Sequence, residues 1–107
     1  MPKIKVSDLE GVALDWAVAQ CEVSGDFIKE IDDPHFYGTD WALAGPIIER
    51  ELIRLDTAYN YTDGQWCARM DTVGGWWPGE TPLIAAMRCY VASRMTDEVE
   101  IPEELTR

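Results

Sequence analysis

Tryptophan and arginine are the residue types in this sequence whose chemistry favours a binding site. Trp76 and Trp77 are adjacent and lie in the glycine-rich stretch 73–80. An indole offers a flat apolar face to a planar ligand, and a guanidinium pairs well with phosphate. Because two neighbouring loop residues cannot easily both face one core, we expect at least one indole to be partly exposed, as at an interface or groove.

Most aromatic residues of the chain share this placement. Eight of the eleven, Trp76 and Trp77 included, lie in or beside expected loops. The eight are Phe36, Tyr37, Trp41, Tyr59, Tyr61, Trp66, Trp76 and Trp77. One interpretation is that these rings close the ends of a small core. The other is that they form a surface for a planar ligand or a protein.

Both aromatic loops lead into expected helix starts, at residues 39–41 and 80–82. A helix N-terminus attracts anions through its unpaired amides and the helix dipole. Asp40 and Glu80 place a negative charge at each start, so ordinary capping is the alternative interpretation.

These observations give a hypothesis for a site that binds a small nucleotide-like ligand. Trp41, Trp76 and Trp77 would stack on the ligand, while Arg69 and Arg88 would balance its phosphate. The candidate residues are Tyr37, Thr39, Trp41, Arg69, Trp76, Trp77, Thr81 and Arg88.

Motifs for metal binding or catalysis are not evident. His35 is the only histidine, and Cys21, Cys67 and Cys89 are widely spaced without a Cys-x-x-Cys pair. This pattern favours reduced, buried thiols over disulfides or a zinc site. Neither a nucleophile motif nor a glycine-rich phosphate loop occurs. We therefore expect a protein that is not an enzyme and needs no metal or cofactor.

The chain is strongly acidic, with a net charge of −11. Residues 8–40 carry −8 and residues 97–107 carry −4, whereas residues 41–96 carry only −1 and contain five arginines. So acidic a surface repels nucleic acid and anionic membranes, and it suits either a role in solubility or a basic protein partner. No apolar run approaches the about 20 residues of a membrane span, and the start does not resemble a signal peptide, so we expect a cytosolic protein.

The first third of the chain predicts one strand and one long helix. Residues 3–6 alternate as a short strand does, and Ser7 with Glu10 forms a capping box for a helix that runs to about Val23. Its expected apolar stripe is Leu9, Val12, Ala13, Trp16, Ala19 and Val23. Residues 27–31 are either a short strand or extended chain, and 32–40 have the composition of a loop.

The remaining two thirds of the chain predict two more helices and several strands. Asp40 or Thr39 caps a helix that Gly45–Pro46 divides into two short pieces. Residues 53–61 and 65–70 predict two strands joined at Asp63–Gly64.

A second long loop is expected at 71–80. Thr81 then caps a helix that has Pro82 in its first turn and reaches about Met95. Residues 97–105 begin as an edge strand. With 107 residues the chain predicts a single domain, 1–107, of the α+β class. We expect a two- or three-layer sandwich, with about three helices packed on a short antiparallel or mixed sheet.

Three blocks of the sequence carry a family resemblance: KIKVSDLEGVALDWAVAQCE, YGTDWALAGPIIERE and TPLIAAMRCYVASRMTDEVEIPEEL. Over nearly its whole length the chain resembles the NinX-like small proteins of tailed bacteriophages, a family of unassigned function. The last two blocks are also similar to the broader phage α/β/α sandwich domain proteins. The resemblance implies this fold, a phage origin and the host cytoplasm, and it implies no catalytic residues.

Two functions of a phage accessory protein agree with these residues. In the first, a binding module that is a homo-oligomer sequesters a nucleotide-derived signal of host defence between the aromatic loops and helix starts. In the second, an acidic inhibitor or adaptor docks on a basic host protein through residues 8–40 and the tail, in the manner of a nucleic-acid charge mimic.

Overall fold

The structure is a computed structural model, and it describes residues 2–22, 37–57, 66–95 and 98–105. The helices are α1 (Gly11–Glu22), α2 (Trp41–Glu51) and α3 (Pro82–Arg94), with short 3-10 turns η1 (Val6–Asp8) and η2 (Glu103–Leu105). The strands are β1 (Lys3–Lys5), β2 (Arg54–Thr57), β3 (Trp66–Met70), β4 (Val73–Gly79) and β5 (Glu98–Glu100).

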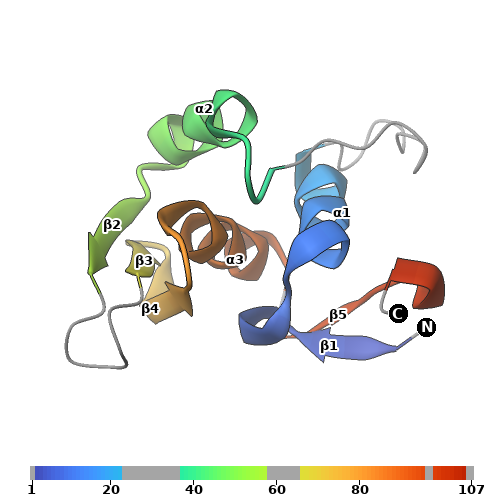
Figure 1. Cartoon of the computed structure of the whole chain (residues 1–107). Helices are drawn as coiled ribbons and strands as arrows, with labels where there is room; N and C mark the ends of the chain where they lie inside the picture. Colours follow the sequence, from blue (N-terminus) through green and yellow to red (C-terminus); the bar gives the residue numbers. More distant parts are fainter. Residues whose placement is uncertain (1, 23–36, 58–65, 96–97, 106–107) are drawn as a thin grey trace.

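The five strands form two separate antiparallel sheets. One has three strands in the order β2-β3-β4, and the other pairs β1 with β5. Helices α2 and α3 lie on one side of the three-stranded sheet, and α1 lies on the far side of α3 (Figure 1). The prediction of a small α+β fold with three helices and antiparallel sheets is therefore confirmed.

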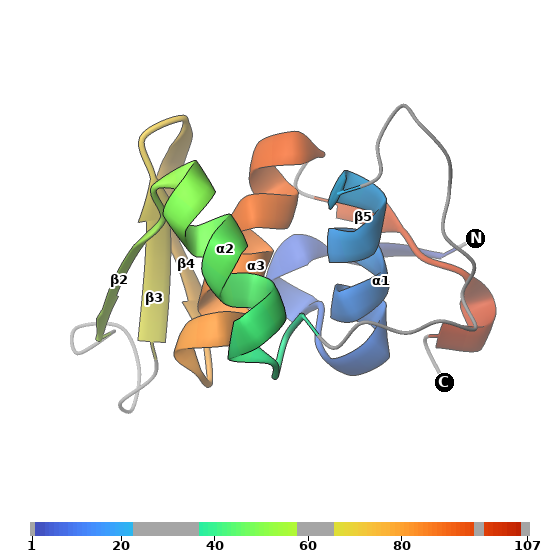
Figure 2. The ribbon, with the colours of Figure 1, turned by 90° about the horizontal axis from the view of Figure 1, so that it is seen from above.

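Helix α3 is the centre of the packing. It contacts β3, β4 and α1, and seven of its residues are buried. Seen from above, α3 lies between the three-stranded sheet and α1, and α2 runs beside it (Figure 2). The buried ring of Tyr90 and the side chains of Leu14, Ile47 and Met87 fill the space between these elements. The apolar side chains of three helices and two sheets thus share one core.

The predicted start of α1 is wrong. Ser7 lies in η1 instead of capping the helix, which begins at Gly11, a residue with a φ of +56°. The apolar stripe is also displaced, because Val12 is 53% exposed. The residues of α1 that are buried are Ala13, Leu14, Ala17, Val18 and Cys21. These residues recur at intervals of three and four, so they form one face of the helix, adjacent to the predicted stripe, that packs on the core.

Helix α2 is one continuous helix, so its predicted division at Gly45–Pro46 is wrong. The predicted cap is confirmed at Asp40, whose side chain accepts a hydrogen bond of 2.9 Å from the amide of Ala42. The helix ends at Leu52, which has a left-handed backbone conformation.

The stretch 71–80 is not a loop. Residues 71–72 form a turn, and β4 follows with its partner β3 beside it. Backbone pairing with β3 outweighs the loop-like composition of Val73–Gly79, which contains three glycines and a proline. The predicted strand at 65–70 is confirmed as β3, and the one at 53–61 is confirmed over Arg54–Thr57 as β2. Residues 58–61, Asp63–Gly64 and 27–31 lie outside the described residues.

The last helix begins as predicted. The hydroxyl of Thr81 accepts a hydrogen bond of 3.2 Å from the amide of Ile84, and Pro82 opens the first turn. The predicted edge strand is confirmed as β5, which pairs with β1.

Candidate ligand-binding face

The two adjacent tryptophans point to opposite sides of the three-stranded sheet, because side chains alternate along a strand. Trp77 lies opposite the fully buried Ala68 of β3 and packs against the core. Trp76 therefore belongs to the other side, which we call the outer face. Both indoles are half-buried, so neither is wholly enclosed.

Two arginines lie together on this outer face. Arg54 of β2 is directly opposite Arg69 of β3 in the antiparallel register. The guanidinium carbon of Arg69 lies 5.9 Å from the centre of the Trp76 ring, which is a cation–π distance. No described helix covers this side of the sheet (Figure 2). The outer face thus presents an indole, two guanidinium groups and, by the same alternation along β2, the exposed carboxylate of Asp56.

The positive charge of these arginines is only weakly neutralised. Arg54 has an ion pair of 3.4 Å with Asp71, but the side chains are 60% and 74% exposed, and such pairs contribute little. Within the described part of the chain, no ion pair within 4.0 Å involves Arg69. Like charges directly opposite each other in a sheet are unfavourable, so an anion on this face would relieve repulsion.

Arg88, which was predicted to balance phosphate, bonds within the fold. Its Nε donates a hydrogen bond of 2.8 Å to the carbonyl of Leu9, and its Nη1 donates one of 2.9 Å to that of Pro78. Burial lowers the pKa of Arg88, although the charges of nearby carboxylates oppose this shift. The guanidinium thus joins α3 to β4 and to the chain before α1.

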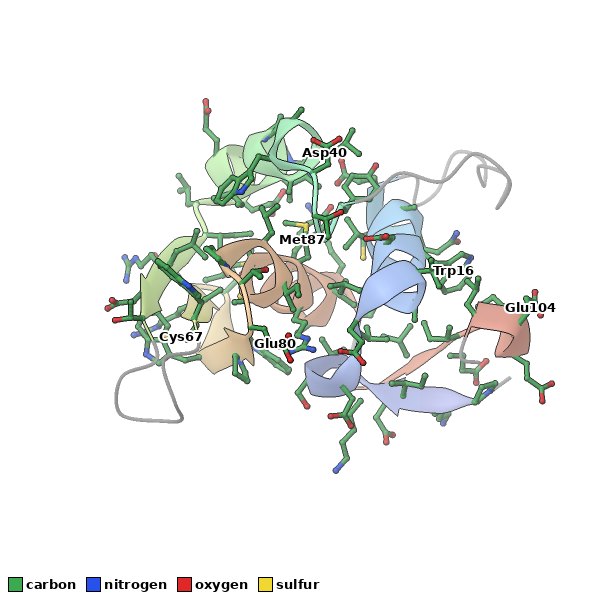
Figure 3. The ribbon with its side chains drawn as sticks, in the orientation of Figure 1. Trp16, Asp40, Cys67, Glu80, Met87 and Glu104 are labelled. Atoms are coloured by element: carbon green, nitrogen blue, oxygen red, sulfur yellow. The ribbon has the colours of Figure 1, made fainter. Side chains whose placement is uncertain are left out.

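The starts of helices α2 and α3 do not line one common site. Asp40 at the start of α2 and Glu80 before α3 are well separated (Figure 3). Trp41 is 55% exposed at the first of these starts, and the hydroxyl of Thr81 is used as a cap at the second.

The candidates that precede α2 stay apart from the outer face. Tyr37 is half-buried and packs against the core, and burial raises its pKa with a smaller effect from the charge of Glu22. Thr39 lies exposed in the turn before α2. Of the predicted site residues, the structure brings together Arg69 and Trp76.

A groove of about 450 Å³ lies beside Trp77, on the inner side of β4. Its lining residues are Lys5, Ser7, Trp77 and Glu98. The indole Nε1 of Trp77 is buried and has no hydrogen-bond partner among the described residues. This groove is separate from the outer face because the two indoles lie on opposite sides of β4.

A polar cluster that joins the three helices was not predicted. The hydroxyl of Tyr90 donates a hydrogen bond of 2.5 Å to Glu22, which also receives one of 2.7 Å from Arg50. Arg50 and Arg94 both contact Glu51, and both lie over the Tyr90 ring. Every charged group here has a partner, so this cluster stabilises the fold. The sequence gives little indication of this cluster, because Arg50 and Tyr90 are 28 and 68 residues away from Glu22 along the chain.

The three cysteines are free and buried, as predicted. Burial is the largest effect on their pKa values, and it raises the pKa of Cys21 to about 12 and that of Cys89 to about 11. These thiols therefore stay protonated and unreactive near neutral pH. The described residues contain no cluster of metal-ligating side chains, and His35 lies outside them. No described helix is long and apolar enough to cross a membrane.

The fold defines a small α+β protein in which no described helix covers one face of the three-stranded sheet. The sequence model of the family described as Bacteriophage P22, NinX matches residues 5–94. The chain therefore belongs to the NinX family of bacteriophage proteins, as the resemblance predicted. Comparison with curated proteins gave no match.

Proposed function

We propose that this protein is a non-enzymatic phage accessory protein that binds a small nucleotide-like molecule on the outer face of its three-stranded sheet. One observation carries the proposal: Arg69 lies over the ring of Trp76 and directly opposite Arg54. An aromatic ring flanked by guanidinium groups suits a ligand that combines a flat base with phosphate.

The energetics agree with binding at this site. Stacking of one base on an aromatic side chain contributes about 1–3 kcal/mol. The contacts that a ligand must replace are weak, because an exposed cation–π contact contributes about 0.5–1 kcal/mol and an exposed ion pair even less. Arg69 can therefore swing from the indole to a phosphate at small cost.

The ligand is small and not a nucleic acid polymer. A net charge of −11 repels a long polyanion, whereas a mononucleotide or cyclic nucleotide meets mainly the local field of the two arginines. For a phage protein in the host cytoplasm, such binding would sequester a nucleotide-derived signal of host defence.

A thermal-shift measurement with a panel of linear and cyclic nucleotides tests this proposal. A ligand at a hundredfold excess over its Kd stabilises the folded state by about 2.7 kcal/mol. We expect Trp76→Ala and Arg69→Ala to abolish the shift. Trp41→Ala is the matched control, because it removes an exposed tryptophan from α2, which lies on the other side of the three-stranded sheet. A panel that shifts nothing, or a shift lost in the Trp41 variant alone, would contradict the proposal.

A further inference from the structure

A second groove, of about 310 Å³, lies where η1 leads into α1. Its lining residues are Ile4, Asp8, Leu9, Glu10, Gly11, Val12, Ala13 and Leu105. The lining combines aliphatic side chains with two carboxylates, and it includes Val12, one of the few large apolar side chains of the described residues that is more than half exposed. The volume falls at the lower end of the range of about 300–1,000 Å³ for ligand pockets, so it suits a short segment of a partner.

The rim of this groove is acidic. Asp8 and Glu10 are both exposed, and no ion pair within 4.0 Å involves either of them in the described ranges. The lysines of the neighbouring strand β1 lie directly opposite Glu98 and Glu100 of β5 in the antiparallel register, where opposite charges attract. The two carboxylates at the rim are therefore available to an external cation.

Arg88 is a nearby cation, since burial lowers its pKa and the charges of Glu10, Asp8 and Glu80 oppose this shift. It does not line the groove, and its guanidinium donates to the carbonyls of Leu9 and Pro78. Leu9 is itself a lining residue, so this hydrogen bond helps to fix one wall of the groove.

We propose that this groove docks a basic segment of a partner protein. An aliphatic side chain of the segment packs against Val12, and a lysine or arginine beside it pairs with Asp8 and Glu10. The strongly negative chain attracts basic partners to this surface and repels acidic ones. This site lies apart from the outer face and does not depend on nucleotide binding.

An NMR titration of the isotope-labelled protein with a short peptide that alternates leucine and lysine tests the groove. We expect saturable amide shifts concentrated at Ile4, Val12 and Leu105, and none with a leucine–glutamate peptide. Shifts spread evenly over the acidic surface would overturn the proposal, because they would show attraction by net charge alone.

Matched variants separate the groove from the total charge. Replacing both Asp8→Asn and Glu10→Gln should weaken peptide binding roughly fivefold, as expected for two exposed ion pairs. The control Glu49→Gln with Asp56→Asn removes the same charge from exposed residues elsewhere and should have a smaller effect. Equal effects of the two double variants would contradict a specific site.

The apolar part of the groove has its own test. Val12→Lys should abolish peptide binding, and Val12→Ser, a milder change, keeps the test valid if the lysine variant does not fold. Trp76→Ala should leave peptide binding unchanged, so failure here and failure of the nucleotide proposal are distinguishable. Unaltered binding by both Val12 variants would contradict the proposal.

Discussion

The helix side and the outer face of the sheet use their polar residues differently. Among the helices, Glu22, Arg50 and Tyr90 bind one another, and Arg88 binds two backbone carbonyls. On the outer face, Arg69 and Trp76 contact each other but remain open to solvent. Groups that are fully satisfied within the fold stabilise it, and groups that remain accessible are free to bind a ligand. Substitutions on the helix side should therefore lower the stability of the fold, whereas substitutions on the outer face should weaken ligand binding.

The largest effect is expected where β4 meets α3. At Gly79 an added Cβ would lie 2.4 Å from the amide nitrogen and 2.8 Å from the Cα of Ala85. Because backbone cannot move aside cheaply, Gly79→Ala should lower the free energy of unfolding by about 3 kcal/mol or more. Gly74→Ala is the control, since a Cβ there meets nothing within 4 Å. Urea denaturation of both variants checks this, and similar midpoints would contradict the described packing of β4 on α3.

The adjacent tryptophans allow a sharper comparison of the two sides. Trp77 packs against the core, so Trp77→Ala should cost about 2–3 kcal/mol of stability, somewhat less than for a fully buried tryptophan. Trp76→Ala should cost less than about 1 kcal/mol and should instead remove nucleotide binding. The same denaturation measurement gives both values. The reverse order of stabilities would mean that the faces of β4 are exchanged.

Replacing Arg88 or Arg69 compares the stability contributed by an arginine bonded within the fold with that of an exposed arginine on the outer face. Arg88→Met leaves the carbonyls of Leu9 and Pro78 without their donor, and we expect a loss of about 2 kcal/mol. Arg69→Met should change stability by less than about 0.5 kcal/mol, as is usual at an exposed position. Should Arg88→Met leave stability intact and weaken nucleotide binding, Arg88 would belong to the ligand site after all.

The smallest effect concerns the pH dependence of the helix cluster. Burial raises the pKa of Glu22, but hydrogen bonds from Arg50 and Tyr90 and the charges of Arg50 and Arg94 outweigh it, so the pKa falls below its usual 4.5. Its contribution is therefore present above pH 4.5 and is lost as the pH falls through the lower, folded-state pKa. Glu22→Gln should flatten the acid limb of the stability curve, and Tyr90→Phe should lower stability by about 1 kcal/mol. An unchanged acid limb in Glu22→Gln would exclude this contribution.

Local signals in the sequence predicted the elements that depend on neighbouring residues. The caps at Asp40 and Thr81 require a side chain and an amide two or three residues away, and both were found. The start of α1 was misplaced because Ser7 and Glu10 fit a capping box that η1 replaces. A local motif can thus be present where the surrounding fold selects another conformation.

The candidate site depended on long-range pairing, which the sequence does not show directly. The sequence of β4 predicts a loop because it is poor in strand formers, and its pairing with β3 is not visible in the local sequence. The pairing decides that Trp76 faces Arg69 and that Trp77 faces inward. The role of Arg88 was also missed, since Leu9 is 79 residues away in the chain.

The central claim is that the outer face is the ligand site, and an NMR titration with adenosine 5′-monophosphate and cyclic nucleotides tests it most directly. We expect saturable shifts at Arg54, Arg69 and the indole N–H of Trp76, and we expect Arg69→Ala to abolish them. Shifts centred instead on Trp41 and Thr81 at the helix starts, or no saturable shift with any nucleotide, would contradict it.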